Sequence, residues 1–134
     1  MLLSQLSDES KKLFLNLEMI LANVDGEFSE SEKKAIANHC AEMKIEPIAY
    51  DETVQLENVI SAINNTMTKK EKKIVFIELV SIALVDGEYH ESEKKFIESL
   101  REFLQIPEEV SEQAVGLMQK LLDISKEIDN FVEW

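Results

Sequence analysis

The chain has 134 residues, of which 45% are hydrophobic and 31% are charged, and its formal net charge is −13. This composition excludes a disordered chain and a disulfide scaffold. The acidic balance also argues against nucleic acids and anionic membranes, whose binding requires clustered Lys and Arg. Three Gly and two Pro supply too few tight turns for an all-β fold. We therefore expect one globular domain that favours cations or a protein partner with a basic surface.

Apolar residues recur at helical spacing in the first half of the chain. They predict helices over about residues 8–24, 30–43 and 52–64. Ser7 is placed to cap the first of these helices, because its hydroxyl can accept a bond from an unpaired backbone N–H. Pro47 is expected to interrupt the second helix, since it lacks a backbone donor.

The second half of the chain predicts three more helices. Thr68 and Glu71 form a capping box at the start of the fourth, which is apolar almost all round over 74–85 and therefore suits a buried central position. The fifth helix spans about 91–104, and the last runs from Pro107 to about Val132. Gly116 is expected to mark a close helix approach. The last helix has an apolar stripe that we expect to face the core: Val110, Ala114, Leu117, Leu121, Ile124, Ile128 and Phe131.

An internal repeat appears when the sequence is shifted by 61 residues. Residues 25–36 then lie over residues 86–97, and nine of the twelve positions are identical. The two copies, at about 13–43 and 74–104, each predict a helical hairpin. With no strand-like alternation, the predicted fold class is an all-α single domain over 1–134, a bundle of about six helices built from two repeated hairpins.

Much of the repeated motif has a purely structural explanation. Gly26 and Gly87 suit a helix end, where a positive φ is common. Phe28 and Tyr89 would insert the hairpin turns into the core. The helix dipole favours the glutamates in the first turn of each following helix, and the Lys residues that come next would screen their charges.

Several acids remain unexplained by these structural roles. Asp25 and Asp86 come at the ends of the preceding helices, where the dipole disfavours a carboxylate. Clustered carboxylate oxygens are ligands that Ca²⁺ and Mg²⁺ prefer, so either cation is a candidate. An EF-hand does not fit, because Leu21 and Ile82 would stand at the first ligand position. The candidate metal ligands are Asp25, Glu27, Glu32, Asp86, Glu88 and Glu93.

At this motif the sequence resembles the tellurite-resistance TerB family, which includes the related N-terminal domain of the co-chaperone DjlA. The resemblance rests on the segment 22–32 and on its copy at 83–93. It implies an all-helical domain whose acidic, metal-binding site is formed by Asp25, Glu32, Asp86 and Glu93. His90 replaces the small capping residue in the second copy.

The remaining motifs favour a binding protein over an enzyme. His39 and Cys40 are adjacent, and neighbours on a helix point in different directions, so a Cys/His nucleophile is disfavoured. No phosphate loop or metalloprotease motif is present. We expect a non-enzymatic module for protein interaction or stress-related signalling, with a plain helical interaction domain without metal as the alternative and a metal-dependent hydrolase as the less favoured one. With neither a signal peptide nor a long apolar run, we expect it in the cytoplasm and not inserted in a membrane.

Overall fold

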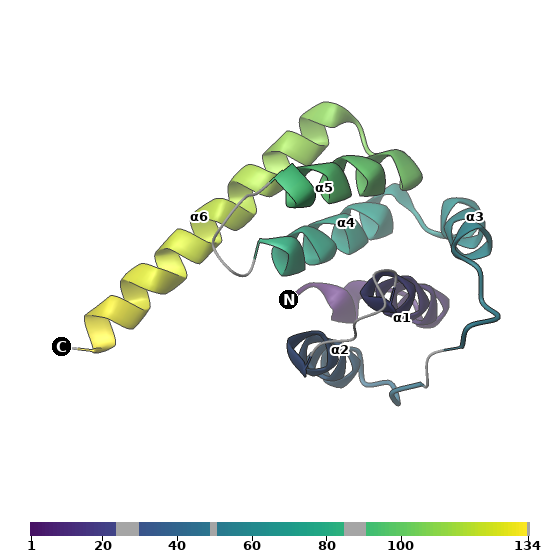
Figure 1. The fold of residues 1–134 in the computed structure, drawn as a ribbon, viewed down its shortest axis with the longest axis horizontal. Coiled ribbons are helices and arrows are strands. Elements are labelled where there is room, and N and C mark those ends of the chain that lie inside the picture. Colours follow the sequence, from purple (N-terminus) through teal and green to yellow (C-terminus); the bar gives the residue numbers. More distant parts are fainter. Residues whose placement is uncertain (24–29, 49–50, 85–90, 134) are drawn as a thin grey trace. The chain divides into compact units, whose positions relative to one another are not determined.

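The fold was analysed in a computed structural model that describes residues 1–23, 30–48, 51–84 and 91–133. Within these ranges the chain forms a 3-10 turn and six α-helices, without a strand, which confirms the all-α prediction (Figure 1). The structure divides into two compact units, residues 1–78 and 79–134, and the boundary falls inside one continuous helix. The elements are η1 (Leu3–Gln5), α1 (Asp8–Asn23), α2 (Glu30–Met43), α3 (Leu56–Thr66), α4 (Lys69–Ala83), α5 (Glu91–Phe103) and α6 (Glu108–Val132).

Two helix starts in the first unit have the predicted caps. Ser10 donates its backbone N–H to the Ser7 hydroxyl, over 3.2 Å, at the start of α1. At the start of α4, Glu71 N donates to Thr68 Oγ1 over 3.1 Å, and Thr68 N donates to Glu71 Oε1 over 3.2 Å. The second Glu71 oxygen accepts the Ser7 N–H at 2.9 Å. One carboxylate therefore caps α4 and also ties it to the start of α1.

The third helix begins four residues later than predicted, at Leu56. The reason is a local turn in which Asp51 Oδ1 accepts both the Thr53 N–H (2.9 Å) and the Thr53 hydroxyl (2.6 Å). Val54 N also donates to the Asp51 carbonyl. An Asp or Thr side chain that bonds nearby backbone groups offers the chain an alternative to the helix.

Helices α2 and α5 end in the same way, at positions 61 residues apart. Lys44 and Gln105 both have φ of 58°. Beyond them, Ile45 N donates to the Cys40 carbonyl at 3.1 Å, and Ile106 N donates to the Arg101 carbonyl at 2.9 Å. This bonding pattern, completed by left-handed residues, is the Schellman motif. The end of α2 is therefore made by Lys44, and the predicted interruption by Pro47 is unnecessary.

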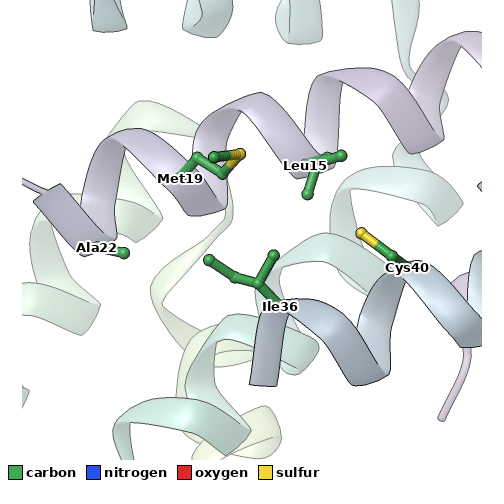
Figure 2. Close-up of a cluster of buried hydrophobic side chains, with 5 residues drawn as sticks. All are labelled: Leu15, Met19, Ala22, Ile36 and Cys40. Atoms are coloured by element: carbon green, nitrogen blue, oxygen red, sulfur yellow. The ribbon is translucent and has the colours of Figure 1, made fainter. Parts of the chain in front are cut away.

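Buried side chains of α1 and α2 form the hydrophobic contact between these two helices (Figure 2). The Cys40 side chain on α2 faces α1 beside Leu15, and Ile36 lies one turn away opposite Met19. Ile45, just past the end of α2, packs against the same cluster. In the same unit α1 also packs against α3, and α2 against η1. The cluster consists of Leu15, Met19, Ala22, Ile36 and Cys40.

Helix α4 is buried along most of its middle, as its apolar sequence predicts. Ile74, Val75 and Phe76 are buried, and Leu79 and Val80 follow them. Glu78 lies among these residues with only 2% of its surface exposed. A buried carboxylate requires compensating partners, and it is the feature of α4 that the apolar pattern did not predict.

The last helix departs from its predicted burial. Pro107 precedes the helix as its N-cap instead of standing in its first turn. Ala114 is buried and Val110 is half-buried, but the stripe is exposed from Leu117 onward. In the second unit, α5 lies beside the first half of α6, and the rest of α6 continues beyond it (Figure 1). The expectation that the whole stripe packs into the core is therefore wrong for its second half.

Gly116 is also not a point of close helix approach, because in the described part of the chain no atom beyond its neighbours in α6 lies within 4 Å of the position that a Cβ would occupy. Ala is favoured over Gly in a helix interior by about 1 kcal/mol. We therefore expect Gly116→Ala to raise the free energy of unfolding by roughly 0.5–1 kcal/mol. Urea unfolding of both proteins measures the change. A destabilised variant would show that this position is crowded in solution.

Candidate functional site

The predicted acidic site lies almost entirely outside the described residues. Asp25, Glu27, Asp86 and Glu88 fall in the ranges 24–29 and 85–90, as do the predicted turn residues of both hairpins. The backbone of Glu32 lies in α2 and that of Glu93 in α5, whereas their side chains are not among those described. The packing of the two copies as repeated hairpins also stays a prediction.

The neighbouring residues that are described make the same contact in both copies. Glu30 and Glu91 are the first residues of α2 and α5. Lys33 Nζ lies 3.3 Å from Glu30 Oε1, and Lys94 Nζ lies 3.6 Å from Glu91 Oε1. These exposed pairs contribute little to stability, at most about 1 kcal/mol each. They do place a Lys ammonium group one turn into each helix.

A second group of charged residues was not predicted as a site, and it is buried in the first unit. His39 Nδ1 lies 2.7 Å from Glu18 Oε1, joining α2 to α1. Glu18 is 5% exposed, and the imidazole of His39 packs edge-on against the Phe14 ring at 5.6 Å between centroids. Burial alone would lower the pKa of His39, but the bond to Glu18 and the charges of Glu18, Glu78 and Glu42 raise it. The protonated imidazole is thereby stabilised.

Two further glutamates of this group hold the N-terminal residues. Leu2 N donates to Glu78 Oε1 over 2.7 Å, and Leu3 N donates to Glu42 Oε2 over 2.8 Å. The Met1 amino group pairs with both carboxylates. Burial would raise the pKa of Glu42, but the bonds from Met1 and Leu3 outweigh it and lower that pKa. These contacts connect η1 to α2 and to the middle of α4.

Cys40 shows no sign of nucleophilic activation. Its side chain is 2% exposed and belongs to the cluster between α1 and α2 (Figure 2). Burial, together with the nearby charge of Glu18, raises the pKa of the thiol. A reactive cysteine needs the opposite shift, because the thiolate is the nucleophile. Packing in this cluster accounts for the presence of Cys40, and His39 is bonded to Glu18 instead of to the thiol.

The buried charged group has no arrangement suited to a metal. Across the described parts of the chain, no three His, Cys, Asp or Glu side chains come together in a way that could hold a metal ion. The contacts of Glu18, Glu42 and Glu78 go to His39 and to groups at the N-terminus. We therefore interpret this group as a structural connection between η1, α1, α2 and α4.

An open groove of about 490 Å³ lies between α5 and α6 in the second unit. Lys94 and Lys95 line one side, and Glu108, Glu112 and Gln119 contribute to the other. Small-molecule sites are usually enclosed and mostly apolar, with a few polar groups. An open groove with mixed charges lacks these features.

These features define the chain as an all-helical protein with a duplicated acidic motif. A comparison with protein-family models matches residues 48–116 to the family described as tellurite resistance protein TerB. The chain belongs to this family, as the resemblance at the acidic motif indicated. The matched segment includes α3, α4, α5 and the second acidic motif. Searches of curated proteins and of solved structures found no match.

None of the described helices has the length and hydrophobicity that a membrane span requires.

Proposed function

We propose that this TerB-family protein is a non-enzymatic interaction module that takes up a divalent cation, Ca²⁺ or Mg²⁺, at its duplicated acidic motif. The observation that carries the proposal is the repetition of the acids in the same place relative to the helices. Each motif lies between a helix that ends at Asn23 or Ala83 and a helix that begins at Glu30 or Glu91. The proposed ligands are Asp25, Glu32, Asp86 and Glu93, with Glu27 and Glu88 as supporting charge.

Electrostatics supports a cation at this motif. A carboxylate beside a helix C-terminus is disfavoured by the helix dipole, and neighbouring carboxylates repel each other. Asp25 and Asp86 follow the ends of α1 and α4 in the sequence. A divalent cation would remove the repulsion among the acids, and hard oxygen ligands are those that Ca²⁺ and Mg²⁺ prefer. The partner we propose is a protein with a basic surface, because the chain carries a net charge of −13.

A plain helical interaction domain without metal is the second candidate. The ion pairs Glu30–Lys33 and Glu91–Lys94 favour it, because they account for part of the motif's acidity by local contacts. On this reading the acids stabilise the helix starts and keep the protein dispersed in water.

Thermal unfolding with and without cations distinguishes the two candidates. A cation at a hundredfold excess over its Kd should stabilise the folded chain by about 2.7 kcal/mol. We therefore expect Ca²⁺ or Mg²⁺ to raise Tm beyond the effect of NaCl at matched ionic strength. The increase should be largely lost in Asp25→Asn and in Asp86→Asn. In the absence of cation these variants should be slightly more stable than wild type, because repulsion is relieved.

Asp123→Asn is the matched control, since it makes the same change at an exposed position on α6. It should respond to cations as the wild type does. Equal melting of the wild type in both cations and in NaCl would contradict the metal proposal and leave the plain interaction domain. A response that Asp25→Asn and Asp86→Asn retain would contradict the assigned site.

A further inference from the structure

From Leu117 to Phe131, α6 presents an apolar stripe that nothing in the described structure covers. Leu117, Leu121, Ile124 and Ile128 are between 41% and 57% exposed, and Phe131 is 76% exposed. A continuous exposed apolar surface on a helix is characteristic of an interaction site. The buried residues of the same helix are Ser111, Ala114 and Met118, toward its start.

The spacing of the stripe identifies the kind of surface. Successive residues of the stripe are four, three, four and three positions apart. This is the heptad spacing of a coiled coil, in which positions a and d face a partner helix. Leu121 and Ile128 take position a, and Leu117, Ile124 and Phe131 take position d. The stripe is therefore suited to another helix lying along it.

The charged residues beside the stripe indicate which helix is its partner. Position g is occupied by Lys120 and by Glu127, one heptad apart, and both are exposed. In an antiparallel pair, g residues of one helix lie next to g residues of the other. A second copy of α6 running in the opposite direction therefore places Lys120 beside the partner's Glu127, and twofold symmetry repeats the contact.

The same alignment also pairs apolar residues with apolar residues. It packs Leu121 against the partner's Ile124, and Leu117 against the partner's Ile128. A slip by one heptad in either direction brings two Lys120 or two Glu127 side chains together. In a parallel pair Lys120 would face Ser125 and Glu127 would face Val132, so neither charge would find an opposite one. Charge thus favours a single arrangement.

We propose that the protein forms a homodimer through an antiparallel pairing of the second half of α6 around a twofold axis between Leu121 and Ile124. Such an interface is isologous, because the same surface is used by both copies. Dimerisation through α6 is independent of cation uptake at the acidic motif, which lies on other elements. It would present four acidic motifs in one assembly, two from each copy.

Sedimentation equilibrium of the full chain, over concentrations from about 1 µM to about 1 mM, tests the dimer. The apparent mass should rise from 15.4 kDa toward twice that value. Ile124→Glu should remain monomeric, because it places a carboxylate at the centre of the interface. Cation titrations of Tm on this variant should match wild type, which separates the dimer from the cation proposal.

Charge exchange tests the antiparallel arrangement without disturbing the apolar stripe. Lys120→Glu and Glu127→Lys should each weaken self-association at least tenfold, because each homodimer then has two repulsive contacts. An equal mixture of the two variants should dimerise like wild type, because both contacts become attractive. Lys126→Glu and Glu133→Lys make the same changes away from the stripe and should leave association unchanged.

Three results would overturn the proposal. A wild type that stays monomeric over the whole concentration range would exclude the homodimer, and the stripe would then be covered by another protein or by its own chain. Single charge variants that dimerise normally would exclude the antiparallel pairing and favour a parallel one. A mixture that fails to associate, although both variants are folded by circular dichroism, would exclude the Lys120–Glu127 contact.

Discussion

The free energy of unfolding should fall as the pH rises above 6.5, and His39 should be the cause. The pKa of His39 in the folded chain is raised above 6.5. Burial opposes this shift, but the bond to Glu18 and the charges of Glu18, Glu78 and Glu42 outweigh it. The folded state therefore holds the proton more tightly than the unfolded state. The resulting stabilisation is complete below the unfolded pKa and is lost as the pH rises through the folded pKa.

Substitution of His39 should remove this pH dependence. In His39→Gln the side chain is neutral at every pH, and the buried Glu18 loses its charged partner. Removing one partner of a buried pair costs about 3–5 kcal/mol. We expect a loss of roughly 3 kcal/mol near pH 6, and a smaller loss as the pH rises through the folded pKa, where the wild type itself loses the proton.

Urea unfolding at several pH values measures this difference. The amino group of Met1 also has a raised pKa and would add a loss of the same sign above about pH 8, so the comparison is made below that value. The matched control is Gln119→Ala on α6, an exposed position whose effect should not vary with pH. If the free energies of unfolding of wild type and His39→Gln differ by the same amount at every pH, His39 does not hold a proton in its bond to Glu18.

The helices could be predicted from the sequence because their causes are local. Apolar residues at helical spacing fix which segments are helical, and caps such as Ser7 and the Thr68–Glu71 box fix where two of them begin. Helix ends were harder to predict. The left-handed residues Lys44 and Gln105 have side chains that carry no strong signal for a positive φ, and the start of α3 depends on one Asp51 turn.

The buried charges were missed because a periodic pattern treats every Glu as a surface residue. Glu18 lies four residues after Phe14, and Glu78 lies four residues after Ile74, so each shares a helix face with a buried apolar side chain. That placement is the signal that was available. Their partners, His39 and Leu2, are distant in the sequence, and only the tertiary structure identifies them.

The stripe of α6 shows the opposite error. Helical spacing was read as burial in the core, although from Leu117 onward the spacing is that of a heptad. Periodicity shows which face of a helix is apolar, but it does not show whether the chain itself covers that face. The assignment of the acidic motif as a metal site stays a prediction for a different reason. Asp25 and Asp86 lie outside the described residues.

Replacement of Glu78 should have the second large effect on stability. The residue is 2% exposed, and its carboxylate accepts the Leu2 N–H at 2.7 Å and lies 3.1 Å from the Met1 amino group. Glu78→Ala removes the carboxylate that the Leu2 N–H and the Met1 amino group contact. It also leaves a cavity beside the middle of α4, where the side chain was buried. The side chain of Met1 is 43% exposed and its amino group keeps Glu42 as its partner, so the main cost is the unsatisfied Leu2 N–H, about 1–3 kcal/mol. We expect a loss within this range in urea unfolding.

The conservative variant separates charge from shape at this position. Glu78→Gln keeps the size and one acceptor oxygen for the Leu2 N–H, but it loses the charge that faces Met1 and His39. A neutral hydrogen bond is weaker than one to a charged group, so the expected loss is about 1–2 kcal/mol. Glu109→Gln, at an exposed position in the first turn of α6, is the control and should change stability by less than about 0.5 kcal/mol.

Hydrogen exchange locates the effect within the first unit. If Glu78 fastens η1 to α4, the amides of Leu2 and Leu3 should exchange faster in Glu78→Ala, even where α1 remains protected. Faster exchange is expected because the N-terminal residues lose one of the two carboxylates that hold them. The other, Glu42, still accepts the Leu3 N–H, so Leu2 should be affected more than Leu3. Unchanged exchange at Leu2, in a variant as stable as wild type, would show that apolar contacts alone hold the N-terminal turn against α4.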